Sequence, residues 1–327
     1  MFLPPGFGEK YVMTTLGRVV YYAPVGKPWS NLTIEPSSDC AEGSAQGNNG
    51  TLVFLHAFGG GSSAYEWSKV YPAFAVDYHI IAPDLIGWGR SDHPARNYRI
   101  EDYIRNIIEF VEKTCNLPIT AISSGLTAAF TICAAIERPD LFKSLILTTP
   151  AGLAEFGQDY SRSMAAQVVK VPVFDRLLYL SGVASGFGIR SFLEQRQFAR
   201  ASRVYPEIVQ AYQQSAQQFN AEYAALAFVR GDLAFDLSQY ITGLSVPTAI
   251  IWGQKSEYTG PDVGGRLAEM NPQAIRIFCH LDDVGLTPQL ELPGVTIGLI
   301  RKFLPLLESK QSESATVNGA GTISISV

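Results

Sequence analysis

Short apolar runs alternate with helical patterns along most of this chain. Because turn residues bound these runs and their apolar positions are continuous, they are typical of strands buried on both faces of a sheet. They span residues 51–57, 79–85, 119–124, 144–150, 248–254 and 274–281, and an early edge strand is expected at 17–24. Helices are expected at 62–74, 101–114, 126–138, 261–270 and 293–307. This alternation predicts an α/β fold, with a mostly parallel central sheet and helices on both of its faces.

One long segment interrupts the alternation. Residues 151–245 have helical character and no clear strand, so we expect an inserted helical cap, or lid, over the carboxyl-terminal edge of the sheet. Residues 1–150 and 246–307 then form the core of the fold. Two polar segments rich in small residues, 26–50 and 308–327, are expected to be a flexible loop and a disordered tail.

Composition and charge exclude several classes of function. The chain of 327 residues has a net charge of −5 and no basic run, which argues against nucleic acid as a partner. Its four cysteines lack metal-ligand spacing, and neither a metal nor a cofactor is expected. Three of them lie in apolar segments, which favours the cytoplasm or another reducing compartment.

We see no secretory signal and no apolar run of the roughly 18 to 20 residues that span a membrane. The oligomeric state stays open.

Four short motifs stand at the ends of predicted strands. They are HAFGGG at 56–61, DLIGWGRS at 84–91, the strand–turn–helix at 119–138 and the Trp-Gly pair at 252–253. In this order and spacing, of which D-L-x-G-x-G-x-S is the most specific part, they resemble the α/β-hydrolase superfamily in its lidded branch, from about residue 12 to residue 307. The resemblance implies a Ser–His–acid triad at the sheet edge.

The resemblance also implies an oxyanion hole. In this family the first motif supplies one backbone amide, here that of Phe58, and the residue after the nucleophile supplies the other, here Leu126. A glycine-rich loop can aim such amides at a developing oxyanion without obstruction by side chains. We therefore expect His56, Phe58, Gly59 and Leu126 at a ligand pocket.

The nucleophile is expected at the turn within 119–138. Family members place it about fourteen residues before the proline that closes the following helix, and from Pro139 this count gives Gly125. The turn also requires small residues two places before and two places after the nucleophile. Gly125 fits best, with Ser123 and then Ser124 behind it. The turn is thus predicted to have lost its nucleophile.

The acid and the base are also replaced. The family pattern W-G-x-x-D gives Ser256 at the acid position, and the pattern G-H-x-x-x-x-E-x-P gives Leu286 at the histidine position. Leucine can neither accept a proton nor protonate a leaving group. Three departures, each flanked by matching residues, predict a degenerate triad at Gly125, Ser256 and Leu286.

Other titratable residues are weaker candidates. His56 is expected to hold the oxyanion loop, and His280 could act as a base only if its strand ended early. His79 is expected to begin a strand and His93 to lie in a loop. Five carboxylates are also candidates for acid or base chemistry, although solvated loop side chains are the simpler interpretation. They are Glu155, Asp159, Glu257, Asp282 and Asp283.

The cap segment 169–193 combines apolar and aromatic residues with Lys170, Arg176 and Arg190. A pair of helices packed on the sheet explains this composition. The alternatives are an apolar acyl or isoprenoid pocket and peripheral contact with a membrane surface.

The expected pocket predicts the class of ligand. Amides near Phe58 and Leu126 can hold one carbonyl group, and Leu286 makes the wall more apolar. We therefore expect a protein that binds a small lipophilic carbonyl or ester compound without turnover. The competing hypothesis is an active carboxyl-ester or lipid hydrolase that uses Ser123 or Ser124 with an atypical base. Cofactor-free lyase or oxygenase chemistry usually needs the missing histidine, and Leu286 disfavours it.

Overall fold

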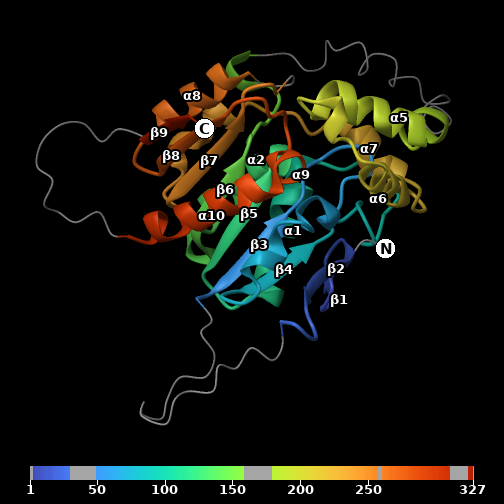
Figure 1. The fold of residues 1–327 in the computed structure, drawn as a ribbon, viewed down its shortest axis with the longest axis horizontal. Coiled ribbons are helices and arrows are strands. Elements are labelled where there is room, and N and C mark those ends of the chain that lie inside the picture. Colours follow the sequence, from blue (N-terminus) through green and yellow to red (C-terminus); the bar gives the residue numbers. More distant parts are fainter. Residues whose placement is uncertain (1–2, 30–48, 158–178, 257–259, 310–322, 327) are drawn as a thin grey trace, which may run out of the picture.

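The computed structural model of the chain describes residues 3–29, 49–157, 179–256, 260–309 and 323–326 (Figure 1). Its described strands form one sheet in the order β1-β2-β4-β3-β5-β6-β7-β8-β9. Neighbouring strands from β4 to β9 are parallel, whereas β1, β2 and β4 pair antiparallel at one edge. The strands are β1 (Phe7–Thr14), β2 (Gly17–Pro24), β3 (Thr51–Leu55), β4 (His79–Pro83), β5 (Ile119–Ser124), β6 (Phe142–Thr148), β7 (Thr248–Gly253), β8 (Ile275–Leu281) and β9 (Ile323–Ser326).

Helices cover both faces of the sheet. The α-helices are α1 (Ile100–Thr114), α2 (Gly125–Glu137), α5 (Gly186–Phe192), α6 (Pro206–Ala216), α7 (Ala221–Arg230), α8 (Pro261–Met270), α9 (Pro288–Glu291) and α10 (Pro293–Glu308). Short 3-10 helices include η1 (Ala64–Trp67) and η2 (Tyr71–Phe74), and the cap contains two π-helical turns, η6 (Tyr179–Val183) and η7 (Leu193–Gln197).

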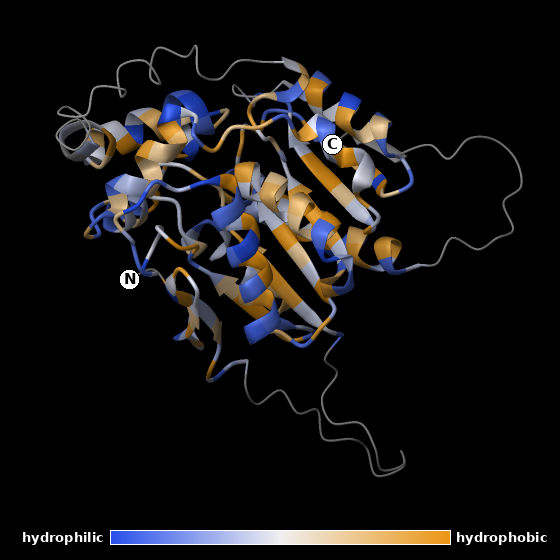
Figure 2. Cartoon of the chain, turned by 180° about the vertical axis from the view of Figure 1, so that it is seen from behind, coloured by the Kyte–Doolittle hydropathy of each residue, from blue (hydrophilic) through white to orange (hydrophobic). Residues whose placement is uncertain are grey.

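The core has two apolar layers, because successive strand residues point to opposite faces. Val53 and Leu55 of β3 pack in the layer that contains α1, α2, α8 and the cap helices. Leu52 and Phe54 pack in the other layer, with η1, η2 and α10. Figure 2 shows the consequence: the strands are largely hydrophobic, whereas the helices carry hydrophilic residues as well. The predicted α/β fold, a mostly parallel sheet between two helical layers, is confirmed.

The segment predicted to form the cap is helical in its described residues. Between β6 and β7 the described residues contain α5, α6 and α7, and their β-structure is limited to an isolated bridge between Leu153 and Phe235. Figure 1 shows these three helices grouped beyond one end of the sheet. Residues 158–178, with Asp159, Lys170 and Arg176, lie outside the described residues. Within the described ranges, no helix combines the length and the hydropathy that a membrane-spanning helix requires.

The structure differs from the prediction in three places. The helix expected at 62–74 is two short 3-10 helices, because Pro72 lacks the amide donor that a continuous helix would need there. Strand β1 was not predicted; its half-exposed side chains give no apolar run. The tail was predicted to be disordered, yet β9 pairs with β8 from Ile323 to Ser326. Its alternating isoleucine and serine residues are a strand pattern that is too short to stand out in a polar tail.

Candidate ligand site at the β5–α2 turn

The turn between β5 and α2 has the backbone of a nucleophile elbow. Ser124 is still extended, with φ −126° and ψ 143°, and Gly125 then turns to φ +58° before the helix continues. Glycine adopts this left-handed conformation without the steric cost that other residues incur. Within 4 Å, a Cβ atom built on Gly125 would meet one atom of the described residues, the Cβ of Ala57 at 3.4 Å. The turn therefore keeps room for a side chain that the sequence does not supply.

A small cavity of about 40 Å³ lies beside this turn. Among the residues predicted at the pocket, Phe58, Gly125, Leu126 and Leu286 line it, whereas His56 and Gly59 do not. The other lining residues are Ala57, Thr149, Ala151, Leu153, Phe192, Gln197, Phe228 and Thr287. The positions expected for the nucleophile and the histidine thus share one mostly apolar cavity.

The acid position lies in the neighbouring loop. The amide of Lys255 donates a hydrogen bond to the carbonyl of Val284 at 2.9 Å, so the loop after β7 runs beside the loop that carries Leu286. Ser256 is buried, and its hydroxyl has no hydrogen-bond partner among the described residues. Ser256 and Leu286 supply neither a carboxylate nor an imidazole to the elbow.

The two alternative nucleophiles lie away from the cavity. Ser123 and Ser124 are fully buried, and neither lines the cavity. The Ser123 hydroxyl accepts a hydrogen bond from Thr131 at 3.0 Å, and that of Ser124 accepts one from the side-chain amide of Gln289 at 3.0 Å. Threonine and glutamine are not general bases, so these contacts do not activate a serine.

The histidines serve other purposes. His56 is buried, and its Nδ1 donates to the carbonyl of Ala57 at 2.7 Å while its Nε2 accepts from the amide of Leu85 at 3.0 Å. Burial lowers the pKa of His56 to about 4, which keeps the ring neutral and fixes this tautomer. His280 lies on β8 and packs edge-on against Phe278, with 4.7 Å between ring centroids. His79 and His93 are likewise absent from the cavity lining.

The carboxylates considered from the sequence do not gather at the elbow. Asp283 forms an ion pair with Arg203 at 2.8 Å and also pairs with Arg200, whose hydrogen bond is the main cause that lowers the pKa of Asp283. Glu155 is buried and accepts a hydrogen bond from the amide of Gly152, and its burial raises its pKa. Asp282 is exposed, and Asp159 and Glu257 lie outside the described residues.

A buried carboxylate that sequence reasoning missed lies behind the cavity. Glu66 accepts hydrogen bonds from the amide of Ala57 at 2.9 Å and from the hydroxyl of Tyr212 at 3.0 Å. Tyr212 accepts from the side-chain amide of Gln197 at 2.8 Å, and this amide also donates to Thr287 at 3.2 Å. Burial raises the pKa of Glu66. The network connects the oxyanion loop with the cap and with the loop at the histidine position.

Of the residues in this network, Glu66 alone could have been recognised from the sequence. Glu66 stands between Tyr65 and Trp67 in a helical pattern, where a carboxylate among large apolar residues could have signalled burial. Its partner Tyr212 is 146 residues away in the chain, and no local pattern predicts that contact.

Two backbone amides at the cavity are available to a ligand. The amide of Phe58 makes no hydrogen bond with any described residue. Leu126 lies in the first turn of α2, where amides have no acceptor within the helix and the helix dipole favours negative charge. Both residues line the same cavity. The oxygen atom of a carbonyl or carboxylate group is the kind of acceptor that such amides bind.

Comparisons with known proteins agree with the fold. Residues 50–291 match the family described as alpha/beta hydrolase fold. The chain is 21% identical to an uncharacterised protein of Mycobacterium tuberculosis over 280 residues, which covers 83% of this chain and 80% of that protein. It is 26% identical to Lipase 1 of Psychrobacter immobilis over 267 residues, or 80% of this chain and 78% of the lipase.

A solved structure shows the same architecture. The structure of a serine hydrolase involved in carbazole degradation superimposes with a TM-score of 0.70 at 15% sequence identity, covering 92% of this chain and 99% of that one. At this identity the likeness concerns the fold alone. Because the family match spans most of the chain, from the first parallel strand to the end of α9, the protein belongs to the α/β-hydrolase fold family.

Proposed function

We propose that this protein binds the carbonyl or carboxylate group of a lipophilic compound at the β5–α2 turn, without Ser–His–acid hydrolysis. The observation that carries the proposal is the shared cavity of Gly125, Leu286 and the amides of Phe58 and Leu126. It combines hydrogen-bond donors with an apolar wall, and its lining contains no histidine or carboxylate that could act as a base and activate a hydroxyl group.

The size of the cavity determines how a ligand would be held. A volume of about 40 Å³ accommodates roughly three water molecules, which suits the carbonyl end of a ligand but not an acyl chain. The apolar part must therefore displace residues of the wall, and Leu153 and Phe192 stand on its cap side. Leu153 has φ +73°, a conformation that is costly for leucine and that a movement of this segment would relieve.

In this proposal the side chain of Leu286 contributes measurably to the affinity for the ligand. Full burial of a leucine side chain is worth roughly 1.5 to 3 kcal/mol, so partial burial against a ligand corresponds to about tenfold in affinity. The name of Lipase 1, a relative at 26% identity, is consistent with a ligand related to lipid esters.

Ligand binding is tested with thermal-shift and native mass spectrometry measurements on fatty acyl and isoprenoid esters. We expect the wild type to bind such esters, and Leu286→Asp to weaken binding about tenfold or more, because a carboxylate would replace part of the apolar wall. Leu306→Asp is the matched control, since Leu306 is a leucine on α10 that is 44% exposed and does not line the cavity. No binding by the wild type, or equal binding by Leu286→Asp, contradicts the proposal.

The absence of hydrolysis is tested with a fluorophosphonate probe, which labels activated serines. We expect no stoichiometric labelling of the wild type. Gly125→Ser alone should react only slowly, whereas the triple variant Gly125→Ser, Ser256→Asp, Leu286→His should label faster, because it restores a base and an acid. Wild-type labelling that disappears in Ser123→Ala or Ser124→Ala would instead establish the competing hypothesis, an active hydrolase.

A further inference from the structure

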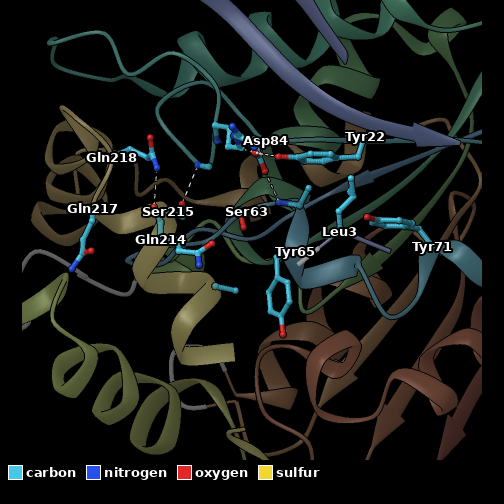
Figure 3. Close-up of a pocket in the computed structure, with 14 residues that line it drawn as sticks. Leu3, Tyr22, Ser63, Tyr65, Tyr71, Asp84, Gln214, Ser215, Gln217 and Gln218 are labelled. Carbon is cyan, nitrogen blue, oxygen red and sulfur yellow. Dashed lines mark hydrogen bonds between the residues drawn. The ribbon is translucent and has the colours of Figure 1, made fainter. Parts of the chain in front are cut away.

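A second and larger cavity lies between the cap and the core (Figure 3). Its volume is about 420 Å³, within the range of roughly 300 to 1,000 Å³ that small-molecule sites occupy. It shares no lining residue with the cavity at Gly125. The core side of its wall includes Tyr22, Tyr65 and Tyr71, and helix α6 and the residues that follow it supply Gln214, Gln217 and Gln218.

Two hydroxyl groups that line this cavity lack hydrogen-bond partners among the described residues. Tyr71 is 1% exposed and Ser63 is 9% exposed, and both line the cavity. Neither hydroxyl forms a hydrogen bond with a described residue, and that of Ser63 does not cap the helix η1 that it precedes. Neither hydroxyl oxygen is fully buried, so both are open to the cavity, where a ligand or water can supply a hydrogen-bond partner.

The two charged side chains of the wall, Asp84 and Arg90, already have hydrogen-bond or ion-pair partners. Asp84 accepts hydrogen bonds from the amide of Ala64 at 2.7 Å, the amide of Arg90 at 2.8 Å and the hydroxyl of Tyr22 at 3.0 Å. The guanidinium group of Arg90 forms an ion pair with Glu9 at 3.0 Å. Three neutral donors thus already occupy the oxygens of Asp84, and Glu9 neutralises Arg90, so neither side chain offers an open partner to an ionic ligand. An uncharged ligand fits this environment better than an ion.

The rim on the cap side offers both donors and acceptors. The side-chain amide of Gln214 makes no hydrogen bond with a described residue. Gln217 donates weakly to the carbonyl of Ala184 at 3.5 Å, and Gln218 donates to the backbone carbonyl of Gln214 at 3.0 Å, so both keep a free side-chain oxygen. Carboxamides can donate and accept at once, as hydroxyl groups of a ligand also do.

We propose that this cavity binds a small, uncharged, polyhydroxylated ring, of the monosaccharide or simple glycoside class. Such a ring has apolar faces that can lie against tyrosine rings, and a perimeter of hydroxyls that can pair with Ser63, Tyr71 and the glutamines. This proposal is independent of the β5–α2 turn, because it does not depend on whether that turn binds a lipophilic ligand.

Titration calorimetry and saturation-transfer NMR on the full chain test this proposal, with methyl β-D-glucopyranoside as the probe. We expect the glucoside to bind and tetrahydropyran-2-methanol, a ring with a single hydroxyl group, to bind at least tenfold more weakly. Tyr71→Phe and Ser63→Ala should each weaken glucoside binding about five- to tenfold, the value of one hydrogen bond. Tyr240→Phe, a control outside the cavity, should leave the affinity unchanged.

Gln214→Met provides a variant that leaves the core intact, because Gln214 is exposed on α6. It should also weaken glucoside binding, and Leu286→Asp should not. The proposal is overturned if the glucoside does not bind, if the two rings bind equally well, or if neither Tyr71→Phe nor Gln214→Met changes the affinity.

Discussion

Replacing Gly125 with alanine tests whether the β5–α2 turn has kept an open nucleophile position. At φ +58° a residue with a Cβ atom pays roughly 1 to 2 kcal/mol relative to glycine. Alanine also lowers the conformational entropy of the unfolded chain, which stabilises the folded protein by about 0.4 to 1 kcal/mol. The added Cβ would meet only the Cβ of Ala57 at 3.4 Å, an ordinary contact. We therefore expect Gly125→Ala to lower the free energy of unfolding by about 1 kcal/mol.

Urea unfolding followed by circular dichroism measures this change, and two glycines calibrate it. Gly157 has φ +81°, and no atom of the described residues lies within 4 Å of a built Cβ, so Gly157→Ala should show the backbone cost alone, again about 1 kcal/mol. Gly61 has φ +100°, and its Cβ would lie 2.1 Å from the carbonyl oxygen of Tyr212, so Gly61→Ala should cost at least about 3 kcal/mol. If Gly125→Ala behaves like Gly61→Ala, the turn has no room for a side chain, and the reasoning fails.

Three further predictions concern the network, the oxyanion loop and the cap. Tyr212→Phe should lower the free energy of unfolding by roughly 1 to 3 kcal/mol, because the buried Glu66 loses a donor; an unchanged urea midpoint would contradict this. The pKa of His56 is lowered from 6.5 to about 4 in the folded protein. The free energy of unfolding should therefore keep its full value above pH 6.5 and fall by roughly 3 kcal/mol as the pH decreases towards 4. In urea titrations at different pH values, His56→Gln should lack this pH dependence. If the cap contacts membranes, Phe187 and Phe219, 84% and 80% exposed, should mediate it; serine at both should abolish vesicle co-sedimentation, and no wild-type sedimentation refutes the idea.

Sequence patterns over a few neighbouring residues predicted the strands and the turn, whereas contacts between distant residues were not predicted. The parallel strands and the β5–α2 turn were predicted because buried strands are continuous apolar runs and the turn lies between a strand and a helix. The positions of Gly125 and Leu286 came from motif spacing, and the structure places both residues at one cavity. The hydrogen bond between Glu66 and Tyr212 and the larger cavity under α6 join residues far apart in the chain, and no short pattern encodes them.

Helix α6 is tied to the core along its length, which determines where the cap can open. Besides the bond from Tyr212 to Glu66, Ser215 accepts from the amide of Gly89 at 3.0 Å and donates to the carbonyl of Ser62 at 3.0 Å. Raising α6 would break these bonds together and expose a carboxylate buried in a low-dielectric environment, at a cost of several kcal/mol. Because Gln197 and Arg203 also bind the core, movement of the cap should be confined to its parts away from these bonds and from α6, and the ligand proposed for the β5–α2 turn should enter past Phe192, which lines its cavity.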